Sequence, residues 1–423
     1  MPFVEALRQL QEHLGYKNMC FIHVSLVPVL GSPSEQKTKP TQHSVAQMRQ
    51  LGLAPDFIAC RGKEPLITAT KRKISMFTSV PENAILSIHD VSNIYRVPLM
   101  LMEQNMSSML AQRLRIHPFA KRKDSRKYSS VTDVAKIDNS SVIKDWTALA
   151  DSVDAPEGEC VIAMVGKYVD QGDAYLSVVK ALTHAAIATK QRLKIEWIVA
   201  SDLDENDSDT TNEIRENAWS KLKKCDGIVV PGGFGTRGFE GKIAAIKYAR
   251  ESGTPYLGIC LGMQASVIEY CRNILGRKKA HSSEFEDDLE PGVEDAVIFM
   301  PEGDRTRMGG TMRLGLRETI LKEGSIAQKI YGTKIIEERH RHRYEVNPAF
   351  VTDLDAAGLH FVGRNTDESG DRMEVIELDK SVHPYYVAAQ FHPEFTSRPE
   401  KPNPLFLGLL QAVTIKLSNA KTI

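Results

Sequence analysis

The sequence has no uninterrupted apolar run that approaches the roughly 20 residues needed to span a bilayer. Its first five residues lack the basic and then apolar pattern of a secretory signal. Its six cysteines form no CxxC pair, which argues against a zinc ribbon and a disulfide framework. Lys plus Arg equals Asp plus Glu at 54 each, so no excess charge indicates nucleic acid or a membrane as a partner. These absences together predict a cytoplasmic protein.

A phosphate-binding loop of the form GxxxxGK[ST] is also missing, as are internal repeats and low-complexity tracts. What the sequence does contain is enough chain for two or three domains, with 423 residues of which 42% are hydrophobic. Strand-like apolar runs alternate with helical periods, and this alternation predicts parallel α/β sheets.

In the first region, up to about residue 110, Phe3, Leu7, Leu10 and Leu14 fall on one face of a predicted helix. Buried strands are predicted at 20–27, 56–60 and 84–88, and further helices at 41–51 and 65–77. The region from about 113 to 159 is polar, carries a basic run at 121–127, and reads as a linker with a short helix near Trp146. A third region begins with a strand at 160–165, and further strands are predicted at 194–200 and 227–230.

The most informative segment of the third region surrounds Cys260. An apolar strand stops there and a helix follows, and glycines stand two residues on either side, at Gly258 and Gly262. Glycines at these places permit the tight turn of a nucleophile elbow, which sets the sulfur near a helix N-terminus and favours the thiolate. A buried core cysteine is the ordinary alternative for a single Cys.

A cysteine nucleophile needs a base and a group that orients the base. His392 and Glu394 follow an apolar strand at 385–389, with Pro393 between them. Because a residue before proline favours an extended backbone, both side chains are predicted to project to the same side. Taken alone, His-Pro-Glu is more often a surface turn. Its occurrence together with the elbow favours an acid–base unit.

A glycine-rich turn at 231–235 directly follows the strand at 227–230. Gly233, Gly235 and Gly238 formally match a dinucleotide-binding fingerprint, but the motif follows the third strand of its region instead of the first. We therefore interpret the turn as an oxyanion hole, formed by its backbone N–H groups together with the N–H of Leu261.

In this order, the three elements resemble the class I glutamine amidotransferases over residues 160–417. The resemblance implies that Cys260 attacks the glutamine side-chain amide, that His392 moves protons and that Glu394 orients His392. Glutamine also needs an acid for its α-ammonium and an Arg for its α-carboxylate, and these anchors are predicted to be Glu284 and Arg343. Further predicted contacts with glutamine are Gly233, Leu261, Gly262, Met263 and Gln264.

The run that contains Arg343 allows two other readings. A solvated strand is the ordinary interpretation of the alternating Arg and His residues at 339–343. His340 and His342 could also begin a metal site, but no third ligand stands nearby in the sequence, so no metal is predicted.

A second basic segment lies near the start of the chain. Lys37 and Lys39 are two residues apart, so an extended backbone, which Pro40 favours at Lys39, places both ammonium groups on one side. Thr38, Thr41 and Gln42 add neutral hydrogen-bonding groups before a helix N-terminus, which suits a nucleoside triphosphate. Two solvated lysines in a loop are an equally good reading of the spacing alone.

The amino-acid sequences of several segments, spread across essentially the whole chain, resemble those of the CTP synthase family. The segments that carry this resemblance are 37–42, 92–98, 165–168, 308–315, 339–347 and 390–395. It implies a fold of two parallel-sheet α/β domains, a P-loop-type synthetase (amidoligase) domain and a flavodoxin-like class I glutamine amidotransferase domain. The predicted domains are then residues 1–112 and 159–418, with a linker at 113–158.

The family resemblance also implies the reaction and its ligands. ATP phosphorylates the uracil 4-oxygen of UTP, and ammonia from glutamine displaces the phosphate to give CTP. UTP or CTP is expected at Lys37, Thr38, Lys39, Pro40, Thr41, Gln42 and Lys73. ATP is expected at Arg61, His89, Asp90 and Val91, although the family often has Lys where this chain has His89. The loop at 309–315, with Arg237, resembles the region that responds to GTP as an allosteric activator.

The missing phosphate-binding loop distinguishes this chain from the CTP synthase family that it resembles. In the family, the glycine-rich ATP loop and the Mg²⁺ ligands precede the position that matches Met1, so the chain is expected to lack about a quarter of the usual length. The loss would remove strands from the first domain and expose apolar surface. Complete members form homotetramers. A chain that retains only glutaminase activity, or serves as a non-synthesising subunit, is the alternative.

Overall fold

The computed structural model describes residues 2–31, 35–116, 141–167, 169, 173–288, 294–300, 312–367 and 370–421. The chain divides into two compact units, Met1–Asp154 and Ala155–Ile423. Each unit contains a sheet with parallel strands, as the alternation of strand-like and helical segments predicts. Within the described ranges, no helix combines the length and the apolar character needed to cross a membrane.

Unit 1 is built on a three-stranded parallel sheet in the order β1-β4-β5. Its strands are β1 (Ile22–Leu26), β4 (Phe57–Gly62) and β5 (Ile85–His89), and β2 (Val29–Leu30) pairs with β3 (Glu35–Gln36) in a separate ribbon. Its helices are α1 (Pro2–Leu14), α2 (Lys39–Gln50), α3 (Thr68–Thr78), α4 (Arg96–Glu103), α5 (Met106–Leu114) and α6 (Ser141–Asp154). Short 3₁₀ turns are η1 (Tyr16–Asn18) and η2 (Glu82–Ala84).

The predicted burial of the first strand of unit 1 is wrong. The first strand is at the edge of the sheet, and Val24 and Leu26 are 65% and 61% exposed instead of buried. Helix α1 forms where the apolar spacing predicts it, but none of its residues is buried and Phe3 is 85% exposed. Apolar spacing locates both elements correctly, yet it cannot reveal whether another element covers the apolar face.

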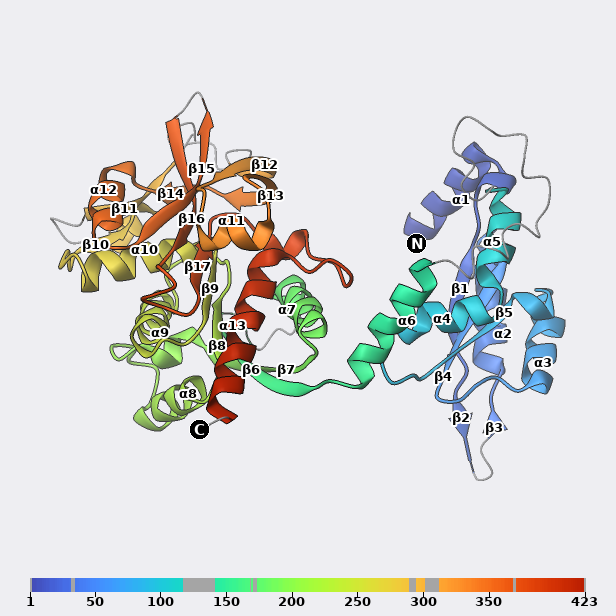
Figure 1. The fold of residues 1–423 in the computed structure, drawn as a ribbon. Coiled ribbons are helices and arrows are strands. Elements are labelled where there is room, and N and C mark those ends of the chain that lie inside the picture. Colours follow the sequence, from blue (N-terminus) through green and yellow to red (C-terminus); the bar gives the residue numbers. More distant parts are fainter. Residues whose placement is uncertain are drawn as a thin grey trace. The chain divides into compact units, whose positions relative to one another are not determined.

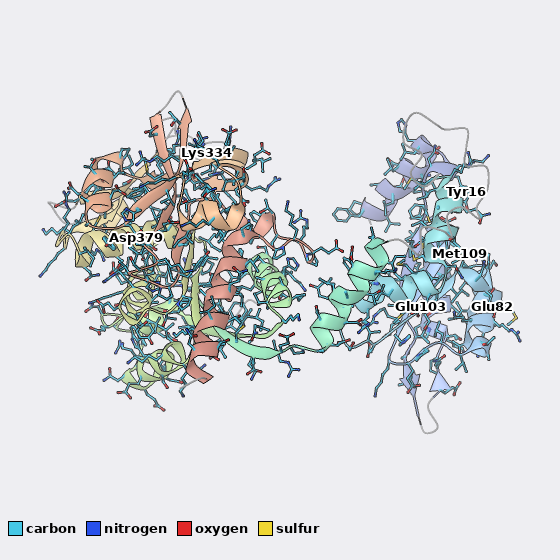
Figure 2. All side chains as sticks on the ribbon, viewed as in Figure 1. Tyr16, Glu82, Glu103, Met109, Lys334 and Asp379 are labelled. Atoms are coloured by element: carbon cyan, nitrogen blue, oxygen red, sulfur yellow. The ribbon has the colours of Figure 1, made fainter. Side chains whose placement is uncertain are left out.

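The C-terminal part of the predicted linker is the 14-residue helix α6, which packs within unit 1. Trp146 Nε1 donates to the carbonyl of Tyr95 at 2.8 Å, and Asn93 Nδ2 donates to the carbonyl of Ala150 at 3.0 Å. The basic run at 121–127 lies outside the described residues. At another point of unit 1, the Arg113 guanidinium stacks 4.4 Å from the ring centroid of Tyr16, the residue labelled beside α5 in Figure 2.

Unit 2 contains a nine-stranded sheet in the order β13-β12-β15-β16-β17-β9-β8-β6-β7. The strands from β17 to β7 are parallel to one another, and those from β13 to β16 are antiparallel. The parallel strands are β6 (Gly158–Gly166), β7 (Gln191–Val199), β8 (Gly227–Val230), β9 (Tyr256–Ile259) and β17 (Tyr386–Ala389). The antiparallel strands are β12 (Arg313–Leu321), β13 (Ile335–His342), β15 (His360–Asp367) and β16 (Gly370–Glu377).

Alternate residues of the central strands point to opposite faces of this sheet, and each face has its own core. In β6, Ala163 and Val165 pack on the side of α8, α9 and α10, whereas Ile162 and Met164 pack on the side of α7 and α13. Figure 1 shows α7 and α13 side by side on that second face. These helices are α7 (Leu176–Ala188), α8 (Asn212–Lys223), α9 (Phe239–Ser252), α10 (Leu261–Asn273) and α13 (Pro404–Lys421).

Smaller elements complete unit 2. A three-stranded sheet contains β10 (Ala280–Ser282), β11 (Glu294–Phe299) and β14 (Tyr344–Val346). The remaining helices are α11 (Ile326–Tyr331), α12 (Pro348–Ala356), η5 (Ala200–Leu203), η6 (Ser283–Asp288) and η7 (Pro393–Phe395). Because β8, β9 and β17 are parallel neighbours, the segments that follow their carboxyl ends meet at one edge of the large sheet.

Candidate active site

Cys260 stands at the turn between β9 and α10, as the flanking glycines predict. Its backbone has φ 53° and ψ −103°, a region that residues other than glycine rarely adopt. The turn is closed by small residues, because a Cβ on Gly262 would lie 2.2 Å from the carbonyl oxygen of Val230. The Cys260 N–H donates to the carbonyl of Ala389 at 2.7 Å, which ties the elbow to β17. The side chain is thereby held at the carboxyl edge of the sheet.

His392 and Glu394 lie beside the elbow and contact each other. His392 Nδ1 is 2.7 Å from Glu394 Oε1. A Cβ on Gly232 would lie 2.9 Å from His392 Cε1 and 3.4 Å from Cys260 Cβ, so Gly232 packs against both residues. Burial would lower the pKa of His392, but the charge of a Cys260 thiolate and hydrogen bonds to Cys260 and Glu394 outweigh it and raise the pKa to about 10. This is the electrostatics of a thiolate–imidazolium pair.

The backbone that brings His392 and Glu394 together is not the extended one that the sequence predicts. Residues Pro393–Phe395 form the 3₁₀ turn η7, with His392 at its N-cap. The carboxylate therefore reaches the imidazole from within a tight turn. Pro393 occupies the first position of this turn, where its missing N–H has no cost.

A buried carboxylate on β13, Glu338, holds the segment that follows this turn. Its oxygens accept hydrogen bonds from Tyr331 Oη at 2.7 Å, Thr396 Oγ1 at 2.8 Å and Asn403 Nδ2 at 2.6 Å. Burial raises the pKa of Glu338 to about 7 despite these donors. Inward and outward residues alternate along β13, so the sequence offered a weak signal for Glu338, but an acid between Glu337 and Arg339 resembles a solvated residue.

We expect Glu338→Gln to change how stability depends on pH. The folded-state pKa lies above the ordinary value of 4.5, so the wild-type chain loses stability as pH rises from about 4.5 to 7 and this residue ionises in its buried site. The glutamine variant lacks that loss, so its free energy of unfolding relative to wild type should improve between pH 5 and pH 8. Urea unfolding of both proteins at pH 5 and at pH 8 measures this difference in the free energy of unfolding. Glu337→Gln on the exposed face of β13 is the control, and a pH-independent difference would contradict the prediction.

The glycine-rich turn after β8 lies next to the elbow and to two charged side chains. The Gly235 N–H donates to Glu284 Oε1 at 2.9 Å, so this carboxylate holds the turn in place. Lys242 Nζ would be 3.6 Å from a Cβ on Gly233, and Lys242 is only 2% exposed. Burial and the charge of Lys167 lower the pKa of Lys242 to about 8, although Glu284 and Cys260 act in the opposite direction. The sequence did not single out Lys242, because a lysine in an amphipathic helix is normally solvated.

The structure places the predicted glutamine contacts at different depths. Burial raises the pKa of Glu284, and the Gly235 N–H, Lys242 and Arg343 partly offset that shift. Leu261 and Met263 are buried in the core with α10, so only their backbone groups can reach a ligand. Gln264 is buried, and its amide donates to the carbonyl of Tyr344 at 2.9 Å. The predicted anchors Glu284 and Arg343 therefore act electrostatically on each other, and the Gln264 amide already has a protein partner.

The two histidines of β13 have the third neighbour that the sequence could not show. His340 Nδ1 lies 3.1 Å from His342 Nε2 and 3.6 Å from Glu374 Oε2 of β16. Mainly because of burial, the pKa of His340 falls to about 2 and that of His342 to about 3, so both rings are neutral. Arg313 Nη2 lies 3.8 Å from Glu374 Oε1 and already places a positive charge beside the carboxylate. We interpret the group as a buried polar cluster of two neutral histidines beside the Arg313–Glu374 ion pair, instead of a metal centre.

The predicted nucleotide segment of unit 1 adopts a different backbone from the one expected. Helix α2 begins at Lys39 with Pro40 in its first turn, so Lys39 is helical and not extended. Thr41 Oγ1 is fully buried and accepts a hydrogen bond from Ser25 Oγ at 2.9 Å, and Gln42 Nε2 donates to Thr38 Oγ1 at 2.9 Å. Lys37 forms an ion pair with Glu35, and the charge of Lys73 also contributes to lowering the pKa of Glu35.

The other predicted nucleotide contacts are partly gathered at the carboxyl ends of β4 and β5. Arg61 Nη2 donates to Asp90 Oδ1 at 2.9 Å, and His89 and Val91 flank Asp90. Arg237 Nη2 donates to the carbonyl of Lys167 at 3.1 Å. Residues 309–311 of the predicted GTP-responsive loop lie outside the described residues, whereas Arg313, Leu314 and Gly315 belong to β12 and not to a loop.

Two family models match the chain. The model described as glutamine amidotransferase class-I matches residues 172–412, and the model described as CTP synthase N-terminus matches residues 1–116. A CTP synthase of Dictyostelium discoideum is 48% identical over 97% of this chain and 71% of its own length. CTP synthase 2 of Bos taurus is 48% identical over 99% of this chain and 68% of its own length.

A solved structure is similar to unit 2. The glutaminase domain of a Trypanosoma brucei CTPS, with bound acivicin, matches with a TM-score of 0.54 and 40% identity. The match covers 60% of this chain and 94% of that domain.

Proposed function

The chain belongs to the CTP synthase family of glutamine-hydrolysing ligases, and on that premise we propose that Cys260, His392 and Glu394 release the ammonia for amination of UTP. The observation that supports this assignment best is the elbow at Cys260 with the 2.7 Å His392–Glu394 contact beside it. In the proposed reaction, the thiolate attacks the side-chain carbonyl carbon of glutamine. Backbone N–H groups of the Gly233 turn and of Leu261 stabilise the oxyanion.

Proton transfer in this proposal is assigned to His392. The imidazolium gives its proton to the departing ammonia, and the neutral ring then takes a proton from the water that hydrolyses the thioester. Glu394 holds the ring in one tautomer through Nδ1. The products are glutamate and ammonia, and the thiolate is regenerated.

A glutamine analogue with an alkylating group in place of the amide tests the assignment of Cys260. We expect stoichiometric labelling of the peptide that contains Cys260, with loss of glutamine hydrolysis in proportion and protection by excess glutamine. Labelling of another cysteine alone, or labelling without loss of activity, would show that the nucleophile is assigned wrongly. Peptide mapping by mass spectrometry distinguishes these results.

We expect Glu284→Gln to raise the KM for glutamine by about 10- to 100-fold with a smaller change in kcat, because the proposed site loses a charged hydrogen bond to the α-ammonium group. Steady-state glutaminase assays measure both constants. The amide oxygen of a glutamine side chain at position 284 can still accept a hydrogen bond from the Gly235 N–H, so the turn should persist. Glu251→Gln, exposed on α9, is the control. A fall in kcat at unchanged KM would contradict the proposed role.

For the nucleotides, members of the family use ATP and GTP, and we propose where this chain contacts them. UTP or CTP is assigned to Lys37, Lys39 and Lys73, where three ammonium groups can face phosphates. Thr41 is assigned a structural role instead, because its hydroxyl is engaged with Ser25.

The ATP contact is proposed at Arg61 and at His89–Val91, and the GTP contact at Arg237. Mg²⁺ is proposed to accompany ATP, but Asp90 already accepts from Arg61 and we assign it no metal. We further propose that the complete protein forms homotetramers, as the family resemblance implies, and that it is cytoplasmic, as the scattered cysteines predict.

A further inference from the structure

Gln390 lies between β17 and His392, and its side chain points at the sulfur of Cys260. The residue is 1% exposed, and its Nε2 is 3.6 Å from Cys260 Sγ, within the range of a hydrogen bond to sulfur. Its backbone N–H donates to the carbonyl of Glu374 at 2.9 Å, which fixes the main chain at this point. The side chain therefore approaches the nucleophile from a rigid segment.

The orientation of the Gln390 amide follows from its neighbours. The carbonyl oxygen of Tyr344 can only accept, so Gln264 must turn its NH₂ group toward it, at 2.9 Å. The same nitrogen of Gln264 lies 3.2 Å from Gln390 Oε1 and donates its second hydrogen there. Since Oε1 of Gln390 is engaged as the acceptor, its NH₂ group faces Cys260 Sγ. A flip of either amide would place two acceptors, or two donors, against each other in a buried site.

The sulfur of Cys260 lies near one hydrogen-bond acceptor and one hydrogen-bond donor. The carbonyl oxygen of Arg341 lies 4.0 Å from Sγ and can accept from a thiol, but it cannot stabilise a thiolate. The N–H of Gln390 can donate to a thiolate, and donation to a charged acceptor in a buried site is stronger than donation to a neutral one. Gln390 thus favours the charged form of the nucleophile.

We propose that Gln390 is a catalytic residue, whose N–H donates to Cys260 Sγ and stabilises the thiolate before attack and when it leaves. This inference rests on the proposed function. In the first half-reaction the S–C bond forms, the C–N bond breaks and the proton from His392 leaves with ammonia. In the second, water adds, the C–S bond breaks and the sulfur recovers its electron pair beside the Gln390 N–H.

The test is the pH dependence of alkylation of Cys260 by iodoacetamide in Gln390→Met, which preserves length and removes the donor. We expect the midpoint of the alkylation rate to move upward by about one to two pH units, as loss of a hydrogen bond to a charged group implies. Glutaminase kcat/KM should fall by about 10- to 100-fold, mainly through kcat. Gln411→Met, exposed on α13, should change neither quantity.

Two features keep the result interpretable. Burial raises the pKa of Cys60, Cys160, Cys225 and Cys271 to about 12, and it also raises the pKa of the partly buried Cys20. The alkylation rate is therefore followed at the peptide that contains Cys260, by mass spectrometry. Alkylation needs no glutamine, so it measures the Gln390–sulfur interaction even if the analogue experiment overturns Cys260 as the nucleophile.

Gln390→Glu provides a second variant if the methionine protein does not fold. It keeps an acceptor for Gln264 but turns an acceptor toward sulfur, so an upward shift of the midpoint is again expected. An unchanged midpoint in a folded variant, whatever its activity, would overturn the proposal.

Discussion

Replacing Cys260 with alanine should lower glutamine hydrolysis by roughly 10⁴- to 10⁶-fold, the usual result when a nucleophile is removed from a group that acts as a unit. The remaining His392–Glu394 pair would then have no thiolate to pair with, and the oxyanion donors would have no intermediate to stabilise. Release of glutamate measured with a coupled assay reports the loss. Residual turnover within about 100-fold of wild type would mean that hydrolysis uses another nucleophile.

A control for this variant is available on the same helix. Cys271 lies in α10, is fully buried and belongs to the core of unit 2. Cys271→Ala makes the same kind of substitution within the helix that begins after the elbow. It should cost some stability but leave kcat and KM for glutamine nearly unchanged. Equal losses in both variants would indicate damage to α10 instead of loss of chemistry.

Replacing Gly241 with alanine should destabilise unit 2 by about 3 kcal/mol or more, because the added methyl group meets backbone that cannot move aside. A Cβ at this position would lie 1.7 Å from the carbonyl oxygen of Ala200 and 2.7 Å from its carbon. Gly241 belongs to α9 and Ala200 begins η5, so relief requires the helix and the turn to separate. Urea and thermal unfolding measure the cost.

The effect of Gly241→Ala should also reach the active site. Lys242 is the next residue of α9, and its Nζ lies near Gly233, so displacement of the helix should reduce glutaminase activity as well. Gly324→Ala is the matched control, because a Cβ there meets open space and the residue loses only the conformational freedom of glycine at φ 80°, about 1 kcal/mol. A similar cost in the two variants would contradict the steric argument.

The parts of the site that could be predicted are those written within a few consecutive residues. The elbow at Cys260 is signalled by its two glycines, and the contact between His392 and Glu394 by their spacing of two. Even here the backbone differed, because η7 is a 3₁₀ turn. The local sequence therefore predicts which side chains contact each other. It predicts less well the dihedral angles that bring them into contact.

The residues that sequence reasoning missed come together through the fold and not through their spacing along the chain. Glu374 of β16 meets His340 of β13 although β12 and β15 stand between these two strands in the sheet order. Glu338 and Lys242 were missed for a different reason, since charged residues in a strand or an amphipathic helix are usually solvated. In unit 1, the same limitation made β1 look buried when Val24 is largely exposed.

The backbone of Cys260 also bears on how this chain can evolve. A residue other than glycine at φ 53° carries a conformational cost of about 1–3 kcal/mol, which the surrounding fold must supply. Glycine would relieve that cost, but it would remove the buried Cys260 side chain and with it the nucleophile. A lineage under no selection for hydrolysis is then expected to lose the cysteine at this strained position.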